Sequence, residues 1–206
     1  MENINSCIKD DMEESFTKLF EAVDKEKWPL FIQVQKQLLQ GKPIDIETVA
    51  EILGASVEDT AQIVGQFGET DQQEKVVAFA GVSIIPTPHS FKVHGKQLYT
   101  WCAADALIFP GFLDVTAEIA SKDPINGEPI TLTVEGKKIK AIEPENALVS
   151  WVTDQDINDI RATMCNRIHF FVSENTANEW QHQNPDAQVF QVKEFLKFSL
   201  NPMDCC

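Results

Sequence analysis

The 206-residue sequence contains no C-x-x-C pair, no H-E-x-x-H motif and no glycine-rich phosphate-binding loop. A zinc site of the usual kind, a dithiol redox motif and a nucleotide phosphate site therefore have no support. Disulfide-framework spacing is also missing, because the five cysteines are odd in number and irregularly placed. If cysteines have a chemical role here, they act as free thiols. They are Cys7, Cys102, Cys165, Cys205 and Cys206.

No apolar run is long enough to span a membrane, and the first five residues lack the basic and apolar segments of a secretory signal. We therefore expect a cytoplasmic protein with no membrane partner. Positive charge is scarce as well: 17 Lys and Arg residues stand against 32 Asp and Glu residues, and the formal net charge is −15. Because nucleic-acid affinity comes largely from Lys and Arg, this balance argues against a nucleic-acid partner.

Helical spacing of apolar residues dominates the first 75 residues, where we predict four helices. The first is indicated by the i, i+3, i+4, i+7 series of Phe16, Leu19, Phe20 and Val23. Start and stop residues for the other three are Pro29 and Gly41, Asp45 and Gly54, and Ser56 and Gly68.

The tight turn between the third and fourth helices, followed by two short strands around Gly81, predicts a winged-helix-like arrangement. A DNA-binding role would need a basic recognition helix. Residues 57–67 instead carry Glu58 and Asp59 and contain no Lys or Arg. We therefore interpret residues 1–75 as a helical, winged-helix-like scaffold domain.

From Val76 onward the apolar period changes from 3.6 to 2, so we place a domain boundary between residues 75 and 76. Turns at His94–Gly95 and Asn126–Gly127 join predicted antiparallel strands. Residues 76–206 are thus predicted to form a mostly antiparallel or mixed β-sheet domain with flanking helices, which places the chain in the α+β class. The later elements are a helix capped by Thr153 and ending at Cys165, a strand over 167–172, a helix with a Thr176/Glu179 capping box, a strand around Val189 and a helix around Phe195.

The stretch from Leu98 to Pro110 combines an apolar approach, one cysteine and one carboxylate. If the following residues are helical, Cys102 and Asp105 are three apart and share a face. Pro110 predicts that this helix ends at Phe109. A thiol and a proton donor in apolar surroundings suit thiol chemistry, but each residue also has an ordinary structural explanation as a buried small side chain or a first-turn carboxylate.

Two segments together resemble a known family: residues 98–110, LYTWCAADALIFP, and residues 165–171, CNRIHFF. They are similar to the organomercurial (alkylmercury) lyases of bacterial mercury resistance. Supporting similarity lies in residues 127–134, in the Glu143–Pro144 turn and in residues 41–43. The resemblance covers essentially the whole chain beyond the first dozen residues.

The resemblance implies that Cys102 and Cys165 are the two mercury-binding thiolates and that Asp105 is a proton shuttle. Mercury(II) is a soft ion and prefers thiolate ligands. Two thiolates on R–Hg⁺ make the bound carbon basic enough to accept a proton, so that R–H leaves. No resident cofactor is implied, because mercury is substrate and product, and external thiols are needed for turnover. The family also suggests mercuric reductase as recipient of the product mercury.

Some features depart from the family pattern or stay open. Asn166 stands where some members carry a further cysteine, and a cysteine in the central turn of some members is absent from residues 121–124. A thiol-based mercury or metal sensor and a dithiol oxidoreductase are the alternative functions. Cys205 and Cys206 are a hypothetical collecting or hand-off pair. We expect the site to be shielded by Trp101, Phe109 and Phe170.

Overall fold

The computed structural model describes residues 27–152 and 160–199. Several predictions concern residues outside these ranges, namely the first helix around Phe16, the Thr153 cap, and the thiols of Cys7, Cys205 and Cys206. In the described ranges the chain folds into helices and two antiparallel sheets, which confirms the α+β class.

Three helices open the described chain where the start and stop signals predicted them: α2 (Trp28–Leu38), α3 (Ile46–Leu53) and α4 (Val57–Phe67). Gly54 takes the left-handed conformation expected of a residue that ends a helix, with φ +62°. Ser56 caps α4 by accepting a hydrogen bond from the Asp59 backbone N–H at 3.1 Å. Asp45 precedes α3 but makes no cap hydrogen bond, and its carboxylate instead pairs with Lys75 at 2.9 Å.

The larger sheet has the strand order β1-β2-β3-β5-β4-β6-β7-β8, and neighbouring strands are antiparallel. Side chains alternate between the buried and the exposed face, as in β7, where Ile130, Leu132 and Val134 are buried. The bounds are β1 Gly68–Thr70, β2 Val76–Phe79, β3 Val82–Ser83, β4 His89–Val93, β5 Lys96–Thr100, β6 Thr116–Lys122, β7 Pro129–Glu135 and β8 Lys138–Glu143.

A smaller sheet has the order β10-β9-β11 and is also antiparallel. Its strands are β9 (Leu148–Val152), β10 (Phe170–Phe171) and β11 (Ala187–Gln191). The remaining elements are α6 (Ile160–Thr163), the 3₁₀ turn η2 (Cys165–Arg167), α7 (Glu174–Gln183) and α8 (Val192–Ser199).

Two predictions about this region are wrong in detail. The strand predicted over 167–172 is reduced to Phe170–Phe171, because the residues from Cys165 form a 3₁₀ turn first. The cap of α7 is Ser173 rather than Thr176: the Ser173 hydroxyl accepts from the Thr176 backbone N–H at 3.3 Å. Both serine and threonine are good caps, and the backbone leaves the extended conformation three residues earlier than the sequence suggested.

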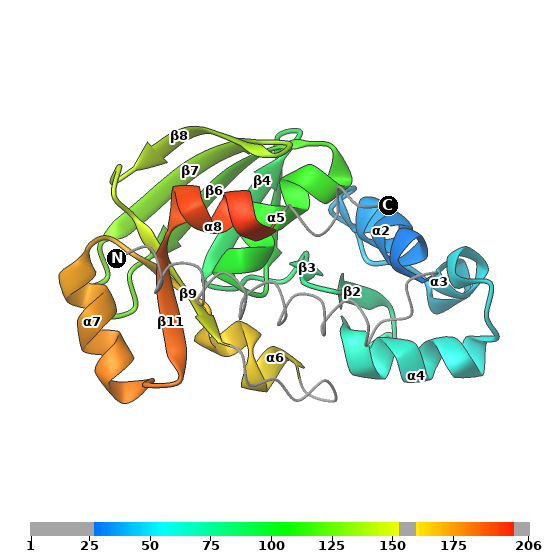
Figure 1. Cartoon of the computed structure of the whole chain (residues 1–206). Helices are drawn as coiled ribbons and strands as arrows, with labels where there is room; N and C mark the ends of the chain where they lie inside the picture. Colours follow the sequence, from blue (N-terminus) through cyan, green and yellow to red (C-terminus); the bar gives the residue numbers. More distant parts are fainter. Residues whose placement is uncertain (1–26, 153–159, 200–206) are drawn as a thin grey trace.

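Helix α5 (Ala103–Leu113) lies in the middle of the molecule (Figure 1). It contacts α2, α8 and strands of both sheets. The prediction that Pro110 ends this helix at Phe109 is wrong, since the helix continues to Leu113. An interior proline costs roughly 3 kcal/mol because it removes one helical hydrogen bond. Nearly every side chain of α5 is buried, and this packing outweighs the local penalty.

One contiguous apolar core runs from Phe31 in α2 to Leu196 in α8. Figure 1 shows α2, α3 and α4 gathered on one side of the molecule, with α7 on the opposite side. Strand β1, which falls within residues 1–75, is one of the two edge strands of the larger sheet. The division into domains at residues 75/76 and the winged-helix detail stay predictions.

Candidate active site

The first part of the site is the N-terminus of α5, where Cys102 is the N-cap residue. Its Sγ accepts a hydrogen bond from the Asp105 backbone N–H at 3.4 Å, so the thiol takes the place usually filled by a serine or aspartate oxygen. The Thr100 hydroxyl donates to the Cys102 carbonyl at 2.9 Å and fixes the backbone as it leaves β5. The predicted shared face of Cys102 and Asp105 is therefore confirmed.

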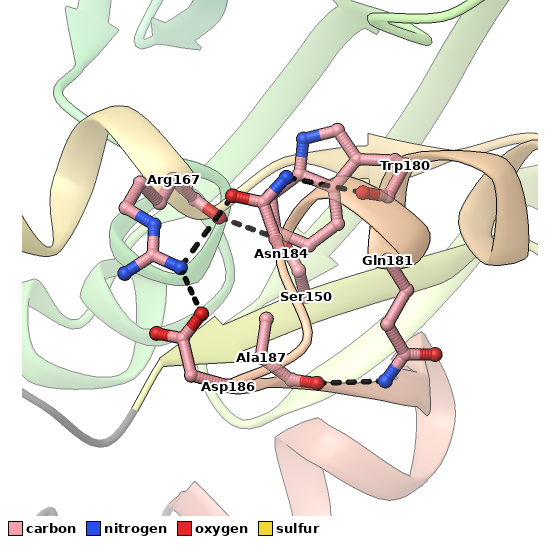
Figure 2. Close-up of polar contacts among 7 residues, drawn as sticks. All are labelled: Ser150, Arg167, Trp180, Gln181, Asn184, Asp186 and Ala187. Carbon is pink, nitrogen blue, oxygen red and sulfur yellow. Dashed lines mark hydrogen bonds and ion pairs between the residues drawn. The ribbon is translucent and has the colours of Figure 1, made fainter.

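The second part of the site is the 3₁₀ turn that carries Cys165, and Arg167 in the same turn anchors it (Figure 2). The Arg167 guanidinium donates to Asp186 at 2.6 Å and to Asn184 at 3.4 Å. The backbone carbonyl of Arg167 accepts a hydrogen bond from the Ser150 hydroxyl at 3.0 Å, which connects the turn to β9. The guanidinium holds the pKa of Asp186 below its usual value.

A direct backbone contact joins the two parts: the Ala103 N–H donates to the Ile168 carbonyl at 3.1 Å. As a result one ligand atom each of Cys102, Asp105 and Cys165 lies within 4.8 Å of the other two. Both cysteines are free thiols and are buried, with exposed fractions of 1% and 5%. The structure thus brings together all three residues that the sequence singled out.

Burial sets the ionisation of Cys102 and Asp105. It raises the pKa of Asp105 from 3.8 to about 7, while the hydrogen bond with Cys102 acts in the opposite direction. Asp105 is half-buried as a whole residue, but its Oδ2 is sealed from solvent and has no hydrogen-bond partner. The pKa of Cys102 is also raised, first by burial and then by Cys165 and Asp105. Near neutral pH the site therefore holds exchangeable protons on the Cys102 thiol and in part on the carboxyl.

A cavity of about 90 Å³ opens over Asp105 and Cys165, and its walls are mainly apolar. Trp101 and Phe109 line it, as the sequence analysis expected. Phe170 does not, because its ring is fully buried beside His89 at a centroid distance of 5.9 Å. Sequence reasoning missed the wall contributed by α2, α4 and the end of α5, which consists of Trp28, Phe31, Phe67, Ile108 and Phe112.

Larger hollows exist elsewhere on the described part of the chain, with volumes of about 460, 590 and 520 Å³. Polar and charged surface residues contribute much of their lining, and none of them contains a cysteine. The dithiol cluster under the apolar cavity is therefore the chemically equipped site.

Two thiols and one carboxyl at this spacing define the class: a thiolate site suited to a soft metal ion, built on an α+β fold. Comparison with known families identifies it further. The family model described as "MerB: Alkylmercury lyase" matches residues 82–203. The chain belongs to the alkylmercury lyase family, as its sequence motifs indicated.

Individual relatives agree with this assignment. The alkylmercury lyase of Staphylococcus epidermidis is 40% identical over 176 residues, covering 84% of this chain and 80% of the relative. That of Bacillus cereus is 39% identical over 195 residues, covering 91% and 88%. Among solved structures, the mercury-bound form of MerB2 matches with a TM-score of 0.77 at 23% identity, over 94% of this chain and 98% of the other. This last similarity concerns the fold.

Within the described residues, no helix combines the length and the apolar character that a membrane crossing requires.

Proposed function

We propose that this protein cleaves the carbon–mercury bond of organomercurials by protonolysis, with Cys102 and Cys165 as mercury ligands and Asp105 as the proton carrier. The observation that carries the proposal is the cluster itself: three functional atoms within 4.8 Å of one another, beneath an apolar cavity, in a chain of the alkylmercury lyase family. The apolar walls suit the organic group of the substrate, and the thiols suit its metal.

In the first step one thiol binds the substrate: Cys–SH and R–Hg–X give Cys–S–Hg–R and HX. Cys102 is equipped for this step although burial raises its pKa, because mercury displaces the thiol proton on binding. Its position at the N-cap of α5 places the developing thiolate against a backbone N–H and the positive end of the helix dipole.

In the second step the Cys165 thiol attacks the same mercury atom, and its proton passes to the Asp105 carboxylate. Asp105 then delivers this proton to the carbon bonded to mercury. The carbon–mercury bond breaks, R–H leaves, and mercury remains as Cys–S–Hg–S–Cys. A carboxyl whose pKa is about 7 both accepts and releases a proton near neutral pH, which is the property a shuttle requires.

Turnover then needs two external thiols, which exchange with the bound mercury and restore both cysteines to the thiol form. No resident cofactor enters these steps, since mercury is substrate and product. A cytoplasmic location is a further part of this proposal and is supported by the N-terminal sequence, which lacks the segments of a secretory signal. Transfer of the product to mercuric reductase is another part, supported by the family resemblance alone.

The test is to incubate the reduced protein with methylmercury and excess small thiol and to follow methane by headspace gas chromatography. We expect enzyme-dependent methane that disappears in both Cys102→Ala and Cys165→Ala. As a control, the triple variant Cys7→Ala/Cys205→Ala/Cys206→Ala, which leaves the cluster intact, keeps its methane production.

Methane production by either active-site variant at the wild-type rate would refute the mechanism. Tight methylmercury binding without methane in the wild type would instead support the alternative, a thiol-based sensor. That alternative has little support as a DNA-contacting protein, because α4 carries no Lys or Arg.

A further inference from the structure

The turn that joins β2 to β3 lies directly against the Asp105 carboxyl. Its two central residues, Ala80 and Gly81, have φ values of +44° and +94°. A Cβ built on Gly81 would lie 2.8 Å from both Cγ and Oδ2 of Asp105, and 2.7 Å from Cζ of Phe109. These separations are well inside van der Waals contact, so only glycine fits at this position without moving the carboxyl or the ring.

The turn itself is held from several sides. The Ala80 N–H donates to the Phe67 carbonyl at 2.7 Å, and the Trp101 N–H donates to the Gly81 carbonyl at 2.9 Å. The side-chain amide of Gln35 in α2 donates to the Ala80 carbonyl at 2.7 Å. Gln35 is 2% exposed and is therefore a buried amide aimed at this turn. Such a fixed backbone cannot simply retreat from an added methyl group.

The carboxyl is held by Cys102 on one side and by packing on the other. Cys102 forms a hydrogen bond with it, but Oδ2 has no hydrogen-bond partner and is sealed from solvent. An oxygen without a partner is not oriented by a hydrogen bond, so the surfaces of Gly81 and Phe109 define where it lies. A catalytic group displaced by about 1 Å can lose about 100-fold in rate.

We propose that Gly81 is a positioning residue for Asp105: its missing side chain leaves the space in which the carboxyl lies, and Gln35 fixes the turn that sets this space. The inference rests on the proposed function, since it concerns proton delivery by Asp105. The turn thus links the helical N-terminal part of the chain to Asp105, because Gln35 of α2 and the Phe67 carbonyl of α4 both hydrogen-bond to it.

The experiment compares Gly81→Ala with Gly127→Ala. Gly127 has φ +74° and nothing within 4 Å of an added Cβ, so its substitution introduces similar backbone strain without a contact. Each variant is mixed with one equivalent of methylmercury, and bound mercury and methane are measured separately. We expect Gly81→Ala to bind one equivalent but to release methane at least about 10-fold more slowly. Gly127→Ala should match the wild type in both.

Two further variants report on the same carboxyl. Gly81→Ala/Phe109→Leu removes the contact with the ring but keeps the contact with the carboxyl, and we expect it to stay slow. Gln35→Met keeps the side-chain length but removes the amide donor, and we expect a several-fold slower release with binding intact. Gln35→Met serves as the test if Gly81→Ala does not fold. A wild-type rate for Gln35→Met in that case would overturn the inference.

A titration readout reports directly on the surroundings of the carboxyl. Displacement of the carboxyl toward water should lower the pKa of Asp105 toward its ordinary value in Gly81→Ala, and carboxyl carbon NMR assigned with Asp105→Asn measures this. If Asp105→Asn releases methane normally, the proposed role of Asp105 fails. If Asp105→Asn is slow while Gly81→Ala behaves like Gly127→Ala, only the role of Gly81 fails.

Discussion

Asp105 is a carboxyl whose ionisation is governed by burial rather than by a neighbouring cation. Its pKa is raised from 3.8 to about 7, and the dominant cause is loss of hydration. The raised pKa makes the free energy of unfolding depend on pH, because a proton bound in the folded state near neutrality is released in the unfolded chain. The same property makes the group useful for proton transfer near neutral pH.

The first prediction concerns the pH dependence of stability. Because the folded-state pKa is the higher one, the stabilising contribution of Asp105 is fully present below about pH 4 and is lost as the pH rises through about 7. Between about pH 5 and pH 8 the loss amounts to about 3 kcal/mol. Urea unfolding at both pH values should show this loss as the difference between the wild type and Asp105→Asn, because buried His89, whose pKa is lowered to about 3, gives both proteins an opposite pH dependence in this range.

Glu118→Gln is the control for this measurement, because Glu118 is an exposed carboxylate on β6. We expect it to keep the wild-type pH dependence. An unchanged dependence in Asp105→Asn would show that the carboxyl does not titrate between these pH values in the folded protein.

The sequence predicts some contacts between single residues of the site and not others. The spacing of Cys102 and Asp105 predicts that they share a face, because their separation is set by local helix geometry. Cys165 lies 60 residues further on, and only the family resemblance connected it to the site. The contact of Gly81 with Asp105 depends on how a turn packs against a helix, which no local pattern records.

The 3₁₀ turn η2 carries Cys165, and the position of the turn depends on Arg167. We predict that Arg167→Ala slows methane release several-fold, since the turn loses its ion pair with Asp186 and its bond to Asn184. The loss in unfolding free energy should stay at about 1 kcal/mol or less, because the ion pair is partly exposed.

Lys193→Ala is the matched control, as it removes the exposed pair of Lys193 with Glu145 at 3.1 Å. It should leave single-turnover release of methane unchanged. Equal rates for Arg167→Ala and Lys193→Ala would mean that the anchor does not hold Cys165 in place.

The sequence predicts helices and strands correctly where local signals agree with tertiary packing. The predicted stops and caps at Gly54, Ser56 and Gly68 are in place. The errors arose where tertiary packing decides between local options. Helix α5 passes through Pro110 because its surroundings are apolar on almost every side, and a turn replaces much of the strand predicted after Cys165.

The described ranges 27–152 and 160–199 share one continuous core, and α2 contacts β2, β3 and α5 within it. We therefore predict a single cooperative unfolding transition, with coincident curves from far-UV circular dichroism and tryptophan fluorescence. The tryptophans report on both parts, since Trp28 lies in α2 and Trp151 in β9. Two separated transitions would instead support independent domains divided near residue 75.

The sequence places a domain boundary at residues 75/76, where the apolar period changes, but pairings in the structure cross this point. Strand β1 and the bridge between Ile44 and Val76 join the segment before this point to the sheet that follows it. Periodicity records the type of element and not its partners, so such pairings are not readable from one sequence.

The most direct test of the account follows mercury and methane together in Asp105→Asn. The amide keeps the shape of the side chain but lacks the carboxyl proton. We predict that this variant retains one equivalent of methylmercury after desalting and releases methane about 100-fold or more slowly than the wild type in a single turnover. Release at the wild-type rate, or loss of mercury binding with normal cleavage of what remains bound, would contradict proton delivery by Asp105.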